Sequence, residues 1–144
     1  MIVTQPKERI AAFVARAQGL AEPWGNYTAI GLVRDGALVA GVVYNNFGGA
    51  GVCAHIGAVT GGRWMTREFL RAIFDYPFAQ LGKRRITGLV ARRNKSARRF
   101  VENLGFKYEG CVRHALEKDD LICYGMLRAE CRFLTAKEPL RRAA

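Results

Sequence analysis

Basic side chains gather in one short stretch of this sequence, from Lys83 to Arg99. Its members are Lys83, Arg84, Arg85, Arg92, Arg93, Lys95, Arg98 and Arg99, and no acidic residue interrupts them. Ammonium and guanidinium groups bind phosphate oxygens through charge-assisted hydrogen bonds. The stretch therefore predicts one of three things: a nucleic-acid contact, a solvated helix face, or one wall of a site for a small phosphorylated molecule.

The composition of the chain predicts a small, basic domain. Its 144 residues are 50% hydrophobic, and the formal net charge of +11 favours an anionic partner. We expect one domain over residues 1–135 and a loosely ordered tail at 136–144. Apolar runs are too short to span a bilayer and no signal peptide is recognisable, which predicts a cytoplasmic protein without membrane contact. The four cysteines show no CxxC pairs or Cys/His set, so we expect no metal site.

The first half of the chain is expected to hold one helix and three strands. Apolar residues at helical spacing follow Pro6 and predict a helix that Gly19 ends. Runs of β-branched and aromatic residues then predict strands, with a tight turn at Asp35-Gly36 between the first two. The expected strands of this half are 27–34, 37–45 and, after a glycine-rich gap, about 52–59.

In the second half, a helix, a strand, a second helix and two strands are expected. Thr66 is a candidate N-cap of the first helix, which Pro77 kinks or ends. Asn94 is the candidate N-cap of the second helix, and Gly105 lies just beyond its end in a Schellman-type pattern. The expected strands of this half are 85–91, 108–116 and 121–127, and polar residues at 117–120 join the last two.

An ordered set of residues in the last third of the chain resembles a known family. From Asn94 the sequence reads NKSARRFVENLGFKYEGCVRHALEKDDLICYGMLRAE, with Leu-Gly-Phe after the helix and Tyr-Gly-Met-Leu-Arg in the last strand. This segment closely resembles the C-terminal half of GNAT-superfamily N-acyltransferases, particularly the branch that includes ribosomal-protein N-terminal acetyltransferases. The resemblance implies a mixed α/β fold: a strongly twisted, mostly antiparallel sheet flanked by helices, whose central strands splay to admit the pantetheine arm of acetyl-CoA.

The turn at 61–66 is where this family binds the CoA pyrophosphate, and the chain has GGRWMTREF from Gly61. Arg63 can take the first position of the family's turn, whereas Thr66 and Glu68 stand where glycines are usual. A helix that begins at about Thr66 still offers its first amides and the positive end of its dipole to a diphosphate. The alternative is an ordinary strand-to-helix connection. The cofactor contacts implied here are Gly62, Arg63, Trp64, Met65, Thr66 and Arg67.

The helix after Asn94 borders the expected CoA groove, which gives its polar residues a second interpretation. Asn94 acts as a helix cap alone, or as a cap whose side chain also contacts pantetheine, as the resemblance implies. Arg98 and Arg99 either lie on a solvated face and pair with Glu102, or one of them or Lys95 binds a CoA phosphate. The apolar stripe of the helix holds it on the sheet in both cases.

Catalytic candidates come from strands beside the cleft. His55 lies on a strand that runs along the active cleft of the family, where an imidazole can take a proton from an ammonium or through a water relay. Its alternative is a structural, half-buried histidine. Many GNAT enzymes protonate the departing thiolate with a helix tyrosine, and Val101 stands at that position here. Tyr124 or Tyr108 can substitute from a neighbouring strand, although each is also an ordinary sheet aromatic.

Two features border the mouth where the family binds its acceptor. Trp24, Asn26 and Tyr27 follow the first helix, where the acceptor-binding loop of the family lies. The acidic hairpin tip, residues 117–120, either receives a cationic amine or is a solvated turn. The acceptor itself stays open, because a protein N-terminus, a lysine, an antibiotic amine and a small metabolite all fit.

These assignments together predict an acetyl-CoA-dependent N-acetyltransferase that moves an acetyl group directly to a primary amine. A backbone amide near Ala58 or Val59 is the expected donor to the oxyanion, and neither a covalent intermediate nor a metal is needed. Two other functions fit parts of the sequence. One is a GNAT-like protein that binds acyl-CoA with little turnover, and the other is a small basic nucleic-acid-binding module, for which no motif is recognisable. The sequence is compatible with a monomer or a dimer.

Overall fold

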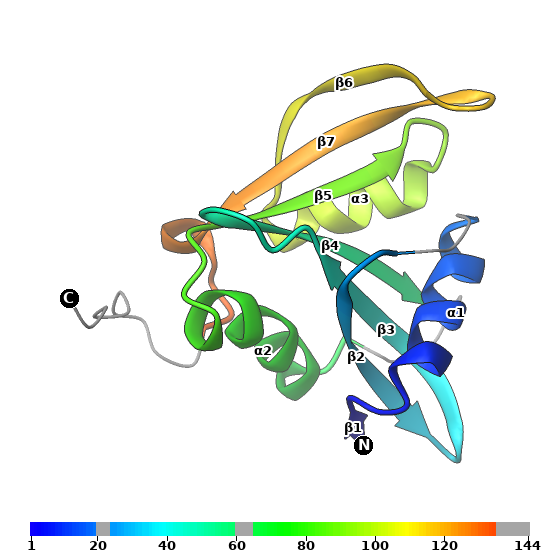
Figure 1. Ribbon diagram of the computed structural model, residues 1–144, viewed down its shortest axis with the longest axis vertical. Helices are drawn as coiled ribbons and strands as arrows, with labels where there is room; N and C mark the ends of the chain where they lie inside the picture. Colours follow the sequence, from blue (N-terminus) through cyan, green and yellow to red (C-terminus); the bar gives the residue numbers. More distant parts are fainter. Residues whose placement is uncertain (20–23, 60–64, 135–144) are drawn as a thin grey trace.

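The computed structural model describes residues 1–19, 24–59 and 65–134, which form strands and helices (Figure 1). The helices are α1 (Lys7–Gln18), α2 (Arg67–Asp75) and α3 (Lys95–Leu104). The strands are β1 (Ile2–Val3), β2 (Tyr27–Arg34), β3 (Ala37–Asn45), β4 (Gly51–Ala58), β5 (Arg85–Ala91), β6 (Lys107–Leu116) and β7 (Asp119–Leu127). None of the described helices has both the length and the apolar character that a membrane crossing requires.

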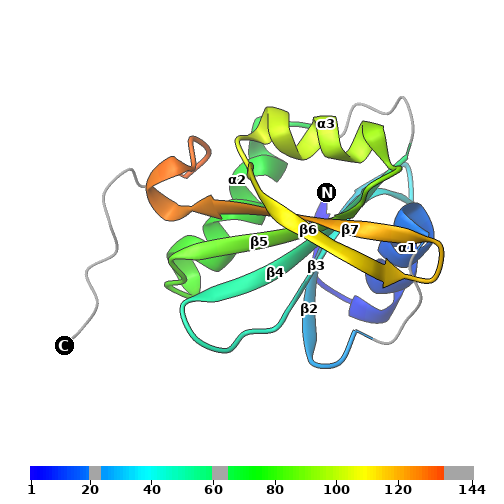
Figure 2. The same ribbon diagram turned by 90° about the horizontal axis from the view of Figure 1, so that it is seen from above.

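All seven of these strands form one sheet, in the order β1-β2-β3-β4-β5-β7-β6. Its neighbouring strands are antiparallel except for β4 and β5, which are parallel. Figure 2 shows how strongly the sheet twists, since β2 runs across the direction of β7. The mixed fold class and the mostly antiparallel, twisted sheet expected from the sequence are confirmed.

The parallel pairing in the centre of the sheet is short. It ends at Ala54 of β4 and Gly88 of β5, whereas β4 continues to Ala58 and β5 to Ala91. The two strands therefore separate at their C-terminal ends, and Figure 1 shows their arrowheads diverging. We call the space between them, beyond Ala54 and Gly88, the splay. It confirms the expectation that the central strands separate.

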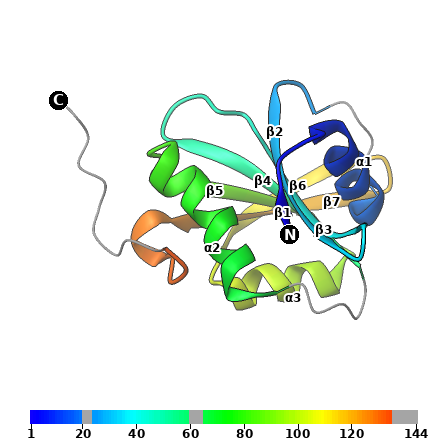
Figure 3. The ribbon, with the colours of Figure 1, turned by 90° about the horizontal axis from the view of Figure 1, so that it is seen from below.

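Two hydrophobic cores lie on opposite faces of the sheet, because successive side chains of a strand point to opposite sides. Figure 3 shows α2 and α3 on one face and α1 on the other. The larger core, under α2 and α3, includes Tyr44, Phe69, Phe74, Val101, Leu104 and Tyr124. The smaller core, under α1, consists of Ile10, Ala11, Val14, Ala29 and Val43.

The helix ends follow the capping rules that the sequence predicts. Thr66 Oγ1 accepts a hydrogen bond from the amide of Phe69 at 3.1 Å, and so caps α2. Gly105 ends α3 with a φ of 109°, which favours glycine, and its amide donates to the carbonyl of Glu102. Between β2 and β3, Asp35 and Gly36 both adopt positive φ, as a tight hairpin turn requires.

The segment after α2 differs from the expectation that Pro77 simply ends the helix. The α-helix stops at Asp75, and a π turn (Tyr76–Gln80) continues it. Pro77 has no amide hydrogen to donate to the carbonyl of Ile73, four residues earlier. The hydroxyl of Tyr44, on β3, donates to that carbonyl instead, at 2.5 Å. A side chain from the sheet therefore satisfies the group that the proline leaves without a helical partner.

The remaining differences concern short elements and one boundary. The two-residue β1 and a 3-10 turn (Arg128–Glu130) were not expected from the sequence. The β6–β7 hairpin turn is tighter than predicted, because Asp119 already pairs with Leu116. The expected tail at 136–144 lies outside the described residues.

Candidate functional site

The edge of β4 that borders the splay presents backbone polar groups. On its other edge, the amide of Val59 donates to the carbonyl of Val39 at 2.9 Å, so this amide is already paired with β3. Successive amides of a strand point to opposite edges, which directs the amide of Ala58 and the carbonyl of Ile56 into the splay. Of the two amides predicted to face an oxyanion, Ala58 has the required direction and Val59 does not.

Gln18, the last residue of α1, reaches the splay from the face that α1 covers. Its Nε2 donates to the carbonyl oxygen of Ile56 at 2.6 Å. Its Oε1 is buried and has no hydrogen-bond partner among the described residues. Gln18 also lines a cavity of about 20 Å³ together with Asn94 and residues of β5. No described strand pairs with β4 beside Ile56. The side-chain amide of Gln18 therefore donates the hydrogen bond that a neighbouring strand would donate there.

Gly57 explains how α1 comes close enough for this contact. A Cβ built on Gly57 would lie 2.8 Å from the Cβ of Ala17 and 3.1 Å from the Cα of Val14. Any larger residue at this position meets the backbone of α1 as well as a side chain. The absence of a side chain at Gly57 therefore lets the last turn of α1 rest directly on β4.

His55 lies on the same strand, and its hydrogen bonds determine its tautomer. Asn45 Nδ2 donates to the carbonyl of Trp24 at 3.2 Å, which turns Asn45 Oδ1 toward His55 Nε2 at 3.0 Å. An amide oxygen only accepts hydrogen bonds, so His55 Nε2 carries the hydrogen and Nδ1 carries the lone pair. Among the described residues, Nδ1 has no hydrogen-bond partner. His55 thus holds a free acceptor in a fixed orientation.

Burial keeps the imidazole of His55 neutral. The side chain is 8% exposed, and its ring centroid lies 4.7 Å from that of Trp24. Burial lowers the pKa of His55 to about 4, because the charged form loses its hydration. At neutral pH the ring is therefore a hydrogen-bond acceptor. With so low a pKa, it can take a proton only from a strongly acidic group, such as the positively charged nitrogen of an amine that has just bonded to a carbonyl carbon.

The predicted phosphate turn is described only in part. Gly62, Arg63 and Trp64 lie outside the described residues. Met65 is 52% exposed, and the exposed Arg67 is the first residue of α2 after its Thr66 cap. The amides of this first turn are the groups that a helix leaves free for an anion.

Asn94 caps α3 and also borders the splay. Its Oδ1 accepts hydrogen bonds from the amide of Ala97 and the hydroxyl of Ser96, both at 3.2 Å. Because Asn94 also lines the cavity beside Gln18, its side chain is within reach of a ligand in the splay. The geometry is thus compatible with both roles that the sequence left open for this residue.

Tyr124 has its hydroxyl group held between two charged side chains of α3. Its Oη donates to Glu102 Oε2 at 2.7 Å and accepts from Arg98 Nε at 3.0 Å. The side chain is fully buried, and this burial raises the pKa of Tyr124 above its ordinary value. Arg98 and Glu102 are therefore linked through Tyr124 rather than directly, while Arg99 stays exposed on α3.

The hairpin tip and the start of α3 enclose a groove of about 600 Å³. Asp119 uses both carboxylate oxygens, which accept from the amides of Arg93 and Asp120. Asp120 uses both of its own, which accept from the amide of His114 and the guanidinium of Arg92. Two carboxylates of the predicted acidic tip, those of Asp119 and Asp120, thus hold the hairpin against the β5–α3 turn.

The basic stretch is not one continuous free surface. Lys83 Nζ donates to backbone carbonyls of Phe47 and Gly49, and Arg85 forms an ion pair with Glu109 at 2.7 Å. Arg92 and Arg98 bind Asp120 and Tyr124, as described above. Half of the eight basic side chains therefore have structural partners within the protein.

The predicted acceptor residues separate in the structure. Trp24 packs on His55, whereas Asn26 is an exposed residue of the turn before β2. Tyr27 begins β2 and has the ammonium of Lys7 4.4 Å above its ring. Trp24 thus contacts a predicted catalytic residue.

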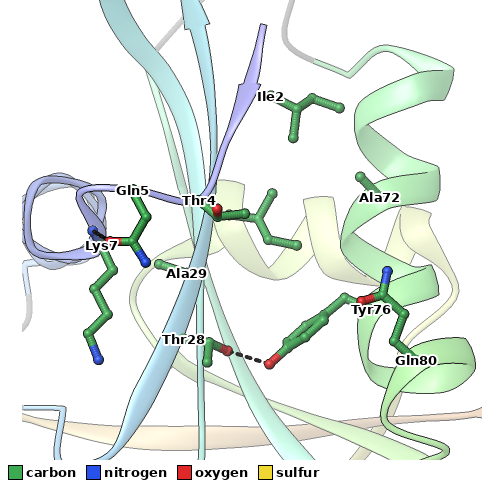
Figure 4. A pocket seen from close by; sticks show the side chains of 10 residues that line it. Ile2, Thr4, Gln5, Lys7, Thr28, Ala29, Ala72, Tyr76 and Gln80 are labelled. Atoms are coloured by element: carbon green, nitrogen blue, oxygen red, sulfur yellow. Dashed lines mark hydrogen bonds between the residues drawn. The ribbon is translucent and has the colours of Figure 1, made fainter.

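A separate cavity of about 390 Å³ lies between β2 and α2 (Figure 4). Thr28 Oγ1 and Tyr76 Oη form a hydrogen bond of 2.9 Å at this cavity. It shares no lining residue with the cavity beside Gln18. It is therefore a separate cavity from the one that Gln18 and Asn94 line.

Sequence reasoning missed two residues of the site, Gln18 and Asn45. Gln18 is a polar residue at the end of an amphipathic helix, just before Gly19, and Asn45 ends an apolar strand. Both positions are ordinary places for polar residues. The hairpin register offered a signal for Asn45: it pairs with Cys53, two positions before His55 on the same face of β4.

Comparison with solved structures finds this architecture in acetyltransferases. A variant of spermidine N-acetyltransferase SpeG from Vibrio cholerae aligns with a TM-score of 0.75 and 14% identity, over 96% of this chain and 98% of that one. The IAA acetyltransferase from Bacillus cereus aligns with a TM-score of 0.74 and 14% identity, over 88% and 98%. A probable acetyltransferase aligns with a TM-score of 0.61 and 24% identity over 71% of this chain, which spans 62% of its length.

No family model and no curated protein matches the sequence. The structural likeness nevertheless extends over nearly the whole chain, and the mostly antiparallel sheet and the splay agree with what the sequence resemblance implies. The chain therefore has the fold of the GNAT-superfamily N-acetyltransferases.

Proposed function

We propose that this protein is an acetyl-CoA-dependent N-acetyltransferase that moves an acetyl group directly to a primary amine. The splay is the observation that carries the proposal. Beyond Ala54 and Gly88, no described strand pairs with the edge of β4 that borders the splay, and the amide of Ala58 points to this edge. The pantetheine arm of CoA contains amide groups and can pair with such an edge as a strand does. The acetyltransferase names of the structural neighbours support acyl transfer.

The polar ends of two helices fit the rest of the cofactor. The capped start of α2 at Thr66 offers amides and a positive dipole end to the diphosphate. Asn94, at the start of α3, borders the splay and can contact the pantetheine. Arg63, Trp64 and Gly62 are assigned to the diphosphate on the sequence resemblance alone.

Acetyl-CoA supplies an acetyl group activated as a thioester. In the transfer, the amine nitrogen forms a bond to the thioester carbonyl carbon, the carbon–sulfur bond breaks, and the nitrogen loses a proton. The amide of Ala58 donates to the carbonyl oxygen while negative charge develops there. His55 Nδ1 accepts a hydrogen bond from the amine, and takes a proton once bond formation has made that nitrogen acidic.

The CoA thiolate leaves with the electron pair of the carbon–sulfur bond and needs a proton. The hydroxyl of Tyr124 already donates to Glu102, and Val101 offers no proton at the helix position that many GNAT enzymes use. A thiol with a pKa near that of cysteine, about 8.5, is a modest leaving group that water can protonate. We therefore assign this proton to water and give Tyr124 the task of holding Arg98 and Glu102 in place.

Two measurements on the full chain test the proposal. Calorimetry should detect acetyl-CoA binding at micromolar affinity, and mass spectrometry should detect an acetylated amine together with free CoA thiol. The absence of binding at near-millimolar acetyl-CoA contradicts the cofactor assignment. Binding without acetyl transfer to any of a panel of primary amines supports the second candidate, an acyl-CoA-binding protein of the same fold, which the missing helix tyrosine at Val101 favours.

A further inference from the structure

The outer edge of β2 is open beside the cavity that lies between β2 and α2. β1 pairs with this edge as far as Val3, which lies opposite Gly31, and ends there. The chain then turns away and begins α1 at Lys7. Ala29, two positions from Gly31, is the next residue of β2 that faces the same edge, and it lines the cavity (Figure 4).

Both backbone polar groups of Ala29 point to this open edge. Val33 uses its amide and its carbonyl to bind Met1 on that side, at 2.8 and 2.7 Å, and every second residue of an antiparallel strand repeats this direction. The carbonyl of Tyr27 fits the same pattern, because it accepts from Lys7 Nζ at 3.2 Å. Ala29 is only 4% exposed, and no described residue pairs with its amide or carbonyl on this side. Buried backbone groups almost always have partners, so a ligand or water must supply them.

The side chains around the cavity add donors and no negative charge. The ammonium of Lys7 carries three hydrogens and donates one of them to Tyr27. Thr28 Oγ1 and Tyr76 Oη share one hydrogen bond of 2.9 Å, so one of their two hydrogens is left to donate to a third group. None of the described residues that line the cavity is acidic. The cavity therefore favours a ligand with an anionic, accepting end.

Apolar side chains form the part of the cavity that faces α2. Ile2, Ile30 and Ala72 line it, and its volume of about 390 Å³ is within the range of small-ligand pockets, roughly 300 to 1,000 Å³. Thr28 and Ile30 point to this face, since Thr28 bonds Tyr76 and Ile30 belongs to the core under α2. An apolar side chain placed opposite Thr28 would thus enter the space between β2 and α2.

We propose that this cavity binds the C-terminal end of a peptide as a short strand added to the edge of β2. The peptide runs antiparallel to β2, and its penultimate residue exchanges two hydrogen bonds with Ala29. Its last residue lies opposite Thr28 and packs an apolar side chain against Ile30. This direction brings the terminal carboxylate toward Tyr27, where the ammonium of Lys7 lies.

The contact between Lys7 and Tyr27 favours a chain end over an internal segment. A strand that continued past Tyr27 would have to displace Lys7 from the carbonyl that it binds. A peptide that ends there keeps this contact and gains an ion pair. The cavity shares no lining residue with the one beside Gln18, so a docked peptide leaves the proposed site of acetyl transfer open.

A matched pair of ligands tests the inference in the intact protein. The first is N-acetyl-glycyl-alanyl-leucine with a free carboxylate, and the second is its C-terminal carboxamide. The acetyl cap removes the amine, so neither ligand can act as an acetyl acceptor. In an NMR titration, the first should move the amide signal of Ala29 downfield with a Kd of about 1 mM or tighter. The carboxamide should bind at least about 5-fold more weakly, because it lacks the charge that Lys7 binds.

The substitution Lys7→Gln removes the ammonium and should reduce the preference for the free carboxylate to about 2-fold or less. Lys118→Gln is the matched control. It removes the same charge from the β6–β7 hairpin, at the opposite edge of the sheet, and should preserve the preference.

Four results would overturn the inference. The first is an Ala29 signal that neither ligand moves at concentrations up to about 10 mM, which would mean that water alone satisfies this edge. The second is equal affinity for the two ligands, or a preference that Lys7→Gln leaves unchanged. The third is an equal shift with acetate alone, which would indicate a simple anion site. The fourth is a set of shifts confined to β4 and β5 beside the splay. CoA binding is measured separately, so none of these results bears on the proposed acetyl transfer.

Discussion

His55 makes the stability of the protein depend on pH in a defined window. Its pKa is about 4 in the folded chain and 6.5 without burial. Below pH 6.5 the unfolded chain binds a proton that the folded chain does not, so the free energy of unfolding falls as pH falls toward about 4. The full shift corresponds to about 3 kcal/mol.

Urea denaturation at a series of pH values between about 7 and 5 measures this effect before most carboxylates titrate. The variant His55→Gln keeps a polar side chain that does not titrate, and should lose most of the slope over this range. A variant with the same slope as the wild-type protein would show that His55 is solvated and titrates normally in the folded state.

The substitution Ala58→Pro tests the amide of Ala58, because proline has no amide hydrogen to donate. Ala58→Pro should lower kcat by about 10²- to 10³-fold, as the loss of an oxyanion donor does, and should change acetyl-CoA affinity much less. Proline is tolerated there because this amide points away from β3, toward the splay. Ala58→Ser keeps the amide and is the control. A folded Ala58→Pro protein with nearly normal kcat would remove Ala58 from the oxyanion site.

At the scale of elements, the contact between α1 and β4 depends on Gly57. Gly57→Ala should lower the free energy of unfolding by about 1 to 3 kcal/mol, because its Cβ would overlap Ala17 and approach the backbone at Val14. It should also move Gln18 away from Ile56 and weaken acetyl transfer.

Gly110→Ala is the matched control for this substitution. A Cβ at Gly110 would meet nothing within 4 Å, and stability should stay within about 0.5 kcal/mol of the wild-type value. Chemical denaturation of both variants decides the comparison. Equal stabilities for the two would mean that α1 can move off β4 without cost.

Most elements could be predicted from the sequence because their signals are local. The cap at Thr66, the turn at Asp35-Gly36 and the glycine after α3 act within a few residues, and the structure confirms them. The partner of the Ile73 carbonyl before the π turn could not be predicted, since it is the hydroxyl of Tyr44, which is distant in sequence. The same reason applies to Gln18, whose partner Ile56 is 38 residues away.

The functional residues were harder to predict than the fold. A strand histidine such as His55 is recognisable as a candidate, but its tautomer depends on Asn45 and on the backbone of Trp24. The resemblance to GNAT enzymes supplied the expected splay. It did not indicate that the Val59 amide would be occupied, because that follows from the register of β4 against β3.

At the scale of the whole molecule, the basic charge predicts weak rather than specific nucleic-acid binding. Lys83, Arg85, Arg92 and Arg98 already bind groups of the protein. We expect a Kd for duplex DNA of about 10⁻⁶ M or weaker at physiological salt, the range of non-specific binding. Fluorescence anisotropy over a series of salt concentrations measures it. Nanomolar binding with a steep salt dependence would make nucleic acid the principal partner.

The short β4–β5 ladder also divides the sheet mechanically. It is the line along which β1 to β4 join β5 to β7, and its parallel pairing stops at Ala54 and Gly88. The sheet therefore consists of two halves, joined by a partial seam of β4–β5 hydrogen bonds. We expect the amides of this seam to exchange with solvent more readily than the amides inside either half. A ligand lying in the splay would lengthen that seam. The protein would then be stiffest when loaded with cofactor, and the acceptor would meet a more rigid site than the one that the cofactor entered.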